Sequence, residues 1–164
     1  MSKSELPHNK DTHKTIILGV GNELMSDEGV GVHVAREMMT RKLPAGVEVI
    51  EGGTDGFGLL NIITDADRLI VIDTLKGGSK PGTIYQFHIE DAPATSDMFK
   101  TSIHQIGILE VIHLSGLIGK TPYTTVIGVE PGSIAMGMEL SDEVRQKVPR
   151  VIEIVEKVVS VIKA

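Results

Sequence analysis

The sequence of 164 residues contains no cysteine and no tryptophan, and aromatic residues make up only 3% of it. The absence of cysteine excludes disulfides, thiolate nucleophiles and metal sites built from sulfur. Any metal ligand in this chain must therefore be an oxygen atom or an imidazole nitrogen. Because aromatic residues are so few, the hydrophobic core must be built from Val, Ile, Leu, Met and Ala, which suits a sheet covered by helices.

Long apolar runs and basic clusters are missing as well. No stretch approaches the roughly 20 consecutive apolar residues of a membrane-spanning helix, and the polar N-terminal segment lacks the apolar core of a signal peptide. The net charge is -6, and the two Tyr and three Phe are not interleaved with Lys or Arg, which argues against a nucleic-acid surface. We therefore expect a cytoplasmic protein that binds neither nucleic acid nor membranes, and we expect a monomer.

The length of the chain fits one domain. Segment 1–14 is polar, shows no helix or strand periodicity, and is expected to be a flexible extension, whereas residues 15–164 are expected to form a single α/β domain. The predicted strands are 15–20, 47–50, 69–72, 83–89 and 124–129, and the predicted helices are 28–41, a short one around 57–63, 103–117 and 141–162, with Pro149 kinking or breaking the last.

The alternation of strands and helices predicts a three-layer α/β/α fold with a twisted, mostly parallel five-stranded sheet. Segment 83–89 alternates side chains along its length and is expected to be an antiparallel edge strand. Segment 90–102 has no periodicity, which is typical of a functional loop.

A glycine turn follows the first predicted strand, and the next helix opens on Asp27 and Glu28. A helix N-terminus holds either an external anion or its own carboxylates, so a phosphate would meet two negative charges here. The spacing also fails the dinucleotide fingerprint, because Leu24 stands where the third glycine should follow Gly19 and Gly21. We interpret the turn as a mount for Glu28, with Asp27 capping the helix; the simpler alternative makes Glu28 a solvated acid.

Two further residues are expected near Glu28. Asp73 ends the third predicted strand, and if the strand order begins 2-1-3, both acids face one crevice at the carboxyl edge of the sheet. Two close acids raise at least one pKa unless a cation lies between them. His104 follows the long loop at a helix start, where a neutral imidazole is favoured.

Glu28, Asp73 and His104 make a donor set suited to nickel or zinc. Each has an ordinary alternative, since Asp73 could cap a turn and His104 could be a surface or capping histidine. The other histidines are expected to be structural or solvated: His8, His13, His33, His88 and His113.

Six segments, taken together, resemble the maturation endopeptidases of nickel-iron hydrogenases, in family order from about Thr15 onward. They are Gly19-Val-Gly-Asn-Glu-Leu-Met-Ser-Asp-Glu-Gly-Val-Gly, Glu51-Gly-Gly-Thr, Leu69-Ile-Val-Ile-Asp, Pro81-Gly-Thr, Ser102-Ile-His-Gln-Ile-Gly and Gly128-Val-Glu-Pro. The resemblance implies a five-stranded sheet between helices and a protease that removes the C-terminal peptide of the hydrogenase large-subunit precursor after nickel insertion.

The resemblance also implies that Glu28, Asp73 and His104 contact metal. The nickel would be supplied by the substrate, zinc or cadmium could replace it in vitro, and the thiolates around nickel would belong to the precursor. Glu28 and Asp73 would be catalytic, with the metal acting in recognition and as a Lewis acid.

Three alternatives stay open at this stage. In the first, Asp73 is the general base and nickel serves recognition only. In the second, the protein is a non-catalytic chaperone that checks the nickel site of the large subunit. In the third, it is a metal-dependent hydrolase of small molecules.

Overall fold

The computed structural model describes residues 13–91 and 103–163, with side chains for 13–91 and 108–161. Most of the predicted extension, residues 1–14, lies outside these ranges, so its flexibility and the domain boundary stay predictions. The elements in chain order are β1 (Thr15–Val20), the 3-10 helix η1 (Ser26–Gly29), α1 (Val30–Met39), β2 (Val47–Gly53), η2 (Phe57–Leu59), α2 (Leu60–Asp65), β3 (Arg68–Thr74), β4 (Ile84–His88), η3 (Ile89–Asp91), α3 (Ile103–Ile118), β5 (Tyr123–Val129), α4 (Asp142–Arg145) and α5 (Val148–Lys163).

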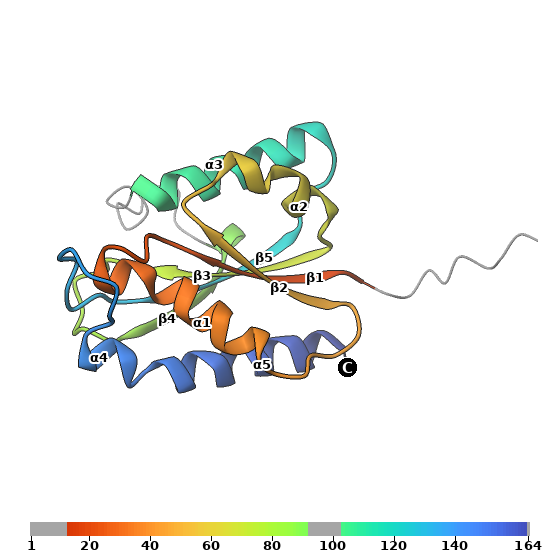
Figure 1. Ribbon diagram of the computed structural model, residues 1–164. Helices are drawn as coiled ribbons and strands as arrows, with labels where there is room; N and C mark the ends of the chain where they lie inside the picture. The colour runs from red at the N-terminus through yellow and green to blue at the C-terminus, as the bar shows by residue number, and fades with distance from the viewer. Residues whose placement is uncertain (1–12, 92–102, 164) are drawn as a thin grey trace, which may run out of the picture.

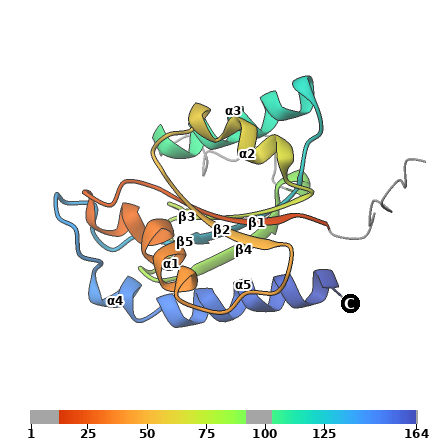
Figure 2. The same cartoon turned by 45° about the vertical axis from the view of Figure 1, so that its right-hand side comes forward.

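The five strands form one sheet in the order β2-β1-β3-β5-β4. Neighbouring strands are parallel except β4, which lies at the edge and runs antiparallel to β5. Helices α2 and α3 cover one face of the sheet, and α1, α4 and α5 cover the other (Figures 1 and 2). The three-layer fold, the antiparallel edge strand and the 2-1-3 start of the strand order are thereby confirmed.

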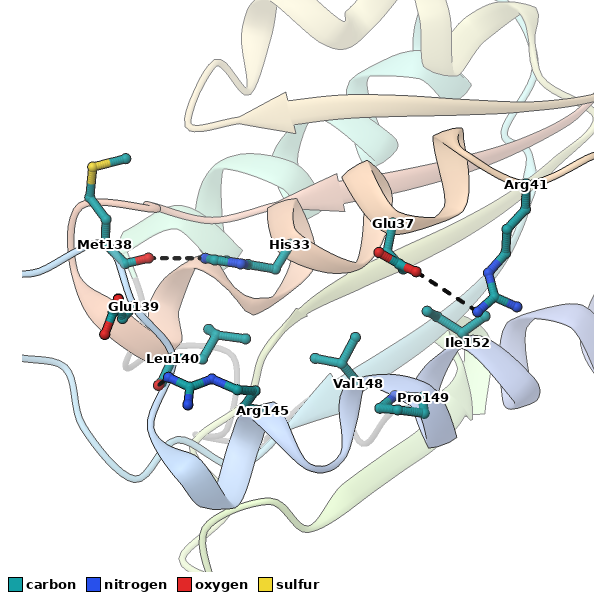
Figure 3. Close-up of a pocket in the computed structure, with 10 residues that line it drawn as sticks. All are labelled: His33, Glu37, Arg41, Met138, Glu139, Leu140, Arg145, Val148, Pro149 and Ile152. Carbon is teal, nitrogen blue, oxygen red and sulfur yellow. Dashed lines mark hydrogen bonds and ion pairs between the residues drawn. The ribbon is translucent and has the colours of Figure 1, made fainter.

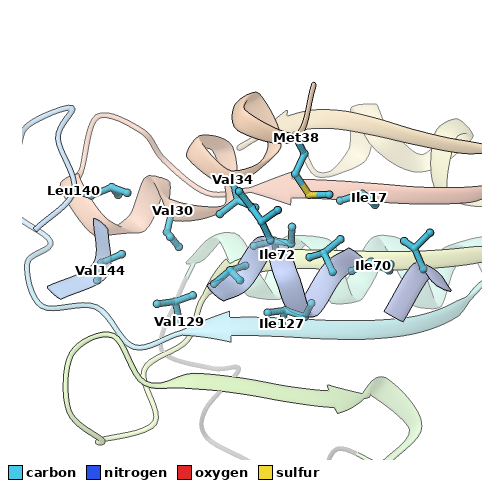
Figure 4. Packing of buried hydrophobic residues seen from close by; sticks show 14 residues of the cluster. Ile17, Val30, Val34, Met38, Ile70, Ile72, Ile127, Val129, Leu140 and Val144 are labelled. Carbon is cyan, nitrogen blue, oxygen red and sulfur yellow. The ribbon is translucent and has the colours of Figure 1, made fainter. Parts of the chain in front are cut away.

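Two aliphatic cores fill the spaces between the layers. Successive residues of β1 point to opposite faces, so Ile17 packs under α1 and α5, whereas Ile16 and Leu18 pack under α2 and α3. Figure 4 shows the first of these cores, in which Met38 of α1 lies close to Ile17. Neither core contains a buried aromatic side chain among the described residues, as the composition predicted.

Glycines bring the start of α1 against the strand backbones. A Cβ atom on Gly31 would lie 2.1 Å from the carbonyl oxygen of Ile72 and 2.4 Å from that of Val20. A Cβ on Gly19 would lie 2.1 Å from the carbonyl oxygen of Gly31. Because these positions lack side chains, η1 and α1 sit directly on the carboxyl ends of β1 and β3.

The C-terminal helical segment is divided into α4 and α5, as expected from Pro149. Pro149 lies in the first turn of α5, where a missing N–H removes no helical hydrogen bond. None of the helices within the described ranges is long and apolar enough to cross a lipid bilayer.

Candidate active site at the carboxyl ends of β1 and β3

Asp73 is a buried carboxyl group near the end of β3, with 4% of the residue exposed. Its Oδ1 accepts a hydrogen bond from the backbone N–H of Thr74 at 2.7 Å. Within the described ranges, its Oδ2 is buried and has no hydrogen-bond partner. Burial raises the pKa of Asp73 well above its ordinary value, the charge of Glu28 raises it further, and the Thr74 N–H opposes the shift.

Glu28 lies in η1, directly before α1, and its side chain is half-buried. It is near enough to Asp73 for the two charges to interact, since the negative charge of Glu28 contributes to the raised pKa of Asp73. The structure therefore brings these two acids to one place, where β1 and β3 end side by side. From β1 the chain continues to β2 on one side of the sheet, and from β3 it continues to β4 on the other side. The carboxyl ends of two neighbouring strands that diverge in this way are the usual position of a binding crevice in open α/β sheets.

Gly21 allows the close approach of the two acids. Its φ is 127°, a conformation that residues with a side chain rarely adopt. A Cβ atom here would lie 2.0 Å from the carbonyl oxygen of Glu28 and 3.2 Å from Oδ1 of Asp73. Any side chain at this position would displace the turn that carries Glu28.

Asp27 does not cap the helix, so that expectation is wrong. No side chain among the residues that the structure describes donates or accepts a capping hydrogen bond at the start of η1 or α1. Asp27 is fully buried, and its Oδ2 accepts hydrogen bonds from the backbone N–H groups of Gly132 and Ser133, both at 2.8 Å. Ser141 donates its backbone N–H to Oδ1 at 2.8 Å and its hydroxyl to Oδ2 at 2.7 Å. Asp27 thus ties the turn of Glu28 to the loop between β5 and α4.

Glu130 is a third acid at this edge of the sheet, and the sequence reasoning assigned it no role. It directly follows β5 and is buried. Its carboxylate accepts hydrogen bonds from the N–H groups of Gly77 and Gly78 at 2.6 and 3.1 Å, and from the Tyr85 hydroxyl at 2.9 Å. Glu130 therefore holds the loop that follows Asp73. The sequence did contain one signal for Glu130, namely an acid placed immediately after an apolar strand.

His104 lies in the first turn of α3, and its side chain is outside the described part of the structure. Its position relative to the two acids stays a prediction. The following turn of α3 does reach Asp73, because Ile108 and Ile112 line a cavity of about 20 Å³ together with Asp73. His104 precedes Ile108 by about one helical turn.

The donor chemistry fits a borderline divalent metal. The described side chains alone include no cluster of three His, Asp or Glu able to hold an ion, so the Glu28–Asp73 pair needs at least one further donor. Two carboxylates and an imidazole suit nickel, zinc or cadmium, and the unpartnered Oδ2 of Asp73 is an available ligand atom.

The remaining described histidines lie in other surroundings. Nε2 of His33 is 3.2 Å from the carbonyl oxygen of Met138, and Nδ1 of His88 is 3.2 Å from the Thr125 hydroxyl. His13 and His113 are exposed. His33 lines a groove of about 540 Å³ between α1 and the α4–α5 segment (Figure 3). Neither Glu28 nor Asp73 lines this groove.

The fold and site define an α/β protein in which a buried acid, Asp73, lies beside the half-buried Glu28 where the strand order reverses. A family model described as hydrogenase maturation protease matches residues 32–158, a span that includes Asp73 and His104 and begins after Glu28. Because the match covers well over half of the sequence, the chain belongs to the hydrogenase maturation protease family.

Individual relatives agree with this assignment. The chain is 36% identical over 128 residues to the hydrogenase expression/formation protein HupD of Bradyrhizobium diazoefficiens, and 40% identical over 120 residues to HupD of Rhodobacter capsulatus. These alignments span 77% and 72% of this chain but 67% and 57% of the two relatives. The hydrogenase maturating endopeptidase HybD from E. coli has a similar structure, with a TM-score of 0.79, 33% identity, and coverage of 87% of this chain and 89% of that one.

Proposed function

We propose that this protein is an endopeptidase that matures a nickel-iron hydrogenase by removing the C-terminal peptide of the large-subunit precursor after nickel insertion. The observation that carries the proposal is the buried Asp73 carboxyl beside Glu28, with an oxygen atom that has no hydrogen-bond partner among the described residues. A buried acid whose pKa is raised by desolvation and by a neighbouring charge is typical of a functional site. The names of the matched relatives support the class of client.

In this proposal the nickel of the precursor is part of the substrate, and Glu28, Asp73 and His104 are its ligands on this chain. A cation between Glu28 and Asp73 would offset their repulsion and stabilise the ionised form of Asp73. Since the chain contains no cysteine, any thiolate ligands of nickel come from the precursor. Three ligands without a thiolate predict modest affinity for free metal.

The metal would supply recognition and Lewis-acid polarisation of the scissile carbonyl group or of a water molecule. Glu28 and Asp73 would hold the scissile segment near the carboxyl edge of the sheet. The raised pKa of Asp73 also supports a variant of the proposal in which Asp73, once ionised, accepts the proton of the attacking water. In that variant, nickel serves only to dock the precursor.

The surface beside Glu28 suits a protein substrate. The loop before η1 and the loop after β5 are joined by a hydrogen bond from the Gly137 N–H to the Leu24 carbonyl oxygen at 2.8 Å. Together they expose Leu24, Met136 and Met138, with Met136 89% exposed. Exposed flexible apolar side chains next to a candidate site are typical of surfaces that contact other proteins.

The proposal is tested by mixing nickel-loaded large-subunit precursor with the purified protein and measuring the precursor mass. We expect a loss of mass with the wild-type chain, and at least about a hundredfold slower loss with Glu28→Gln, Asp73→Asn or His104→Ala. Glu37→Gln, which changes an exposed acid on α1, is the matched control and should process at the wild-type rate.

Other outcomes separate the alternatives. Precursor that binds but keeps its mass with the wild-type chain would favour the nickel-checking chaperone. Activity on small amides without any precursor would favour the small-molecule hydrolase. Tight, nickel-dependent docking by Asp73→Asn without cleavage is expected if Asp73 is the general base.

A further inference from the structure

A second groove, of about 450 Å³, lies at the opposite end of the sheet from Asp73. Arg68 and Tyr123, the first residues of β3 and β5, pair with each other and line it. Asp73 is five residues further along β3, which corresponds to about 17 Å at about 3.3 Å per residue. The groove is bounded by the sheet on one side and by α5, which runs beneath β4 and β5, on the other (Figure 2). It is therefore separate from the candidate active site.

The groove is lined by positive charge in a chain whose net charge is -6. In the described part of the chain, its lining includes Arg68, Arg150 and Lys157 and contains no Asp or Glu. Among the described residues, Arg68 and Lys157 form no ion pair, and Arg150 pairs at 3.0 Å only with Glu153. Both side chains of this ion pair are exposed to solvent, and exposed ion pairs contribute little to the free energy of folding. Three guanidinium or ammonium groups are thus available to an anionic partner.

The sheet wall of the groove is ordered by ring contacts. The Arg68 guanidinium lies 5.9 Å from the centroid of the Tyr123 ring, a cation–π arrangement. The His88 and Tyr123 ring centroids are 4.8 Å apart, and Nδ1 of His88 is 3.2 Å from the hydroxyl oxygen of Thr125. These contacts hold Arg68 in place, so less side-chain entropy would be lost when an anion binds.

The helix wall of the groove is long, and basic and apolar side chains alternate along it. Arg150, Ile154, Lys157 and Val161 recur at helical spacing along one face of α5 and line the groove. From the first to the last of these residues the helix rises about 16 Å, which is the length of roughly five extended residues. Arg150 and Lys157 are separated by about 10 Å along the axis, more than one small anion spans. The shape therefore suits a linear ligand with several negative charges and apolar side chains between them.

We propose that this groove binds an extended acidic peptide segment of a partner protein. The carboxylates pair with Arg68, Arg150 and Lys157, and the apolar side chains lie on Ile154 and Tyr123. The site is independent of the proposed proteolysis, because it neither includes nor contacts the Glu28–Asp73 pair. The net negative charge of the protein repels such a peptide, so binding depends on the local positive charge of the groove.

The test uses the full chain and a fluorescein-labelled peptide of alternating Glu and Leu, six residues long, followed by fluorescence anisotropy at low and at physiological salt. We expect saturable binding that weakens with added salt, and at least about tenfold weaker binding for Lys157→Glu. Lys42→Glu makes the same charge change at an exposed position outside the groove and should alter the affinity less than about twofold.

Two controls keep the outcome decisive. Thermal unfolding of each variant shows whether α5 is intact, and Lys157→Gln, which removes the charge without reversing it, should have an intermediate affinity. No saturable binding, or equal weakening by Lys42→Glu, would overturn the proposal. Displacement of the peptide by citrate at equal concentration would also overturn it, because it would show a site for compact anions. Since the readout is binding alone, failure here leaves precursor processing unaffected.

Discussion

Both oxygen atoms of the Asp27 carboxylate accept a hydrogen bond from Ser141, across 114 positions of the chain. The backbone N–H groups of Gly132 and Ser133 supply two more donors to the same carboxylate. The turn that carries Glu28 and the loop between β5 and α4 are therefore one connected unit. Displacing either segment would disturb the other.

Asp27→Asn should destabilise the protein by about 3 kcal/mol, because an amide NH₂ group would face buried N–H donors where a carboxylate oxygen now accepts. The measurement is the free energy of unfolding from urea denaturation. Ser141→Ala, which loses only the hydroxyl, should cost about 1 kcal/mol. Equal effects of the two substitutions would show that the charge of Asp27 is not what holds the loop.

The raised pKa of Asp73 predicts a pH dependence of stability. In the unfolded chain Asp73 ionises near its ordinary pKa, whereas in the folded chain it stays protonated to higher pH. The unfolded state then binds fewer protons, so the metal-free protein should lose stability as the pH rises from about 4 through the folded pKa. Asp73→Asn removes this contribution and should be the more stable protein at pH 7.

This prediction is checked by urea unfolding of both proteins in EDTA between pH 4 and 8. The difference in unfolding free energy should grow with pH, by about 1.4 kcal/mol for each unit between the two pKa values. Glu28→Gln should show an intermediate profile, because it removes only the Glu28 contribution to the shift. Parallel profiles for wild type and Asp73→Asn would contradict the raised pKa.

Divalent metal ions should offset the loss of stability that Asp73 causes at neutral pH, if the proposed ligands are correct. Nickel, zinc or cadmium added at pH 7 would bind the ionised carboxylates and raise the melting temperature of the wild-type chain. The rise should be smaller in Glu28→Gln, Asp73→Asn and His104→Ala, and unchanged in His113→Ala, which alters an exposed histidine further along α3. An equal rise in all of these variants would place the metal elsewhere.

Gly21→Ala should reduce precursor processing more than its loss of stability explains. The added Cβ would lie 2.0 Å from the Glu28 carbonyl oxygen, so the turn must move away from Asp73. Gly78→Ala is the matched control, since Gly78 also has a positive φ of 79° but its Cβ would meet no atom within 4 Å. The Gly78→Ala substitution should lower the free energy of unfolding by about 1 kcal/mol through backbone strain and leave the processing rate unchanged.

The sheet could be read from the sequence because its strands are short, continuous apolar runs bounded by turn residues. Every residue of β1 is buried, as expected of a central parallel strand. The limit of a helix's buried face is harder to read from the sequence: Met38 is fully buried, whereas the next residue, Met39, is exposed. It is the last residue of α1, where the chain leaves the sheet, and periodicity alone does not show where such contact ends.

The candidate site was also predictable from the sequence only in part. Glu28 and Asp73 were both predicted from their positions after apolar strands, and the strand order brought them together. The role of Asp27 was mistaken because local rules favour a helix cap for an acid at that position, whereas its donors come from a distant loop. Glu130 was missed for the same reason, since its partners lie 45 to 53 positions away in the chain.

The sequence by itself determined the strands, the aliphatic core, the glycine turn, the acid after β1 and the acid near the end of β3, because each depends on neighbouring residues and on side-chain period. Only the tertiary structure decided how the turn beginning at Gly19 holds Glu28. Burial of Asp73, the tether from Asp27 to Ser141 and the cationic groove beside α5 all arise from segments far apart in the chain. Their energies come from desolvation and long-range hydrogen bonds, which local sequence patterns do not encode.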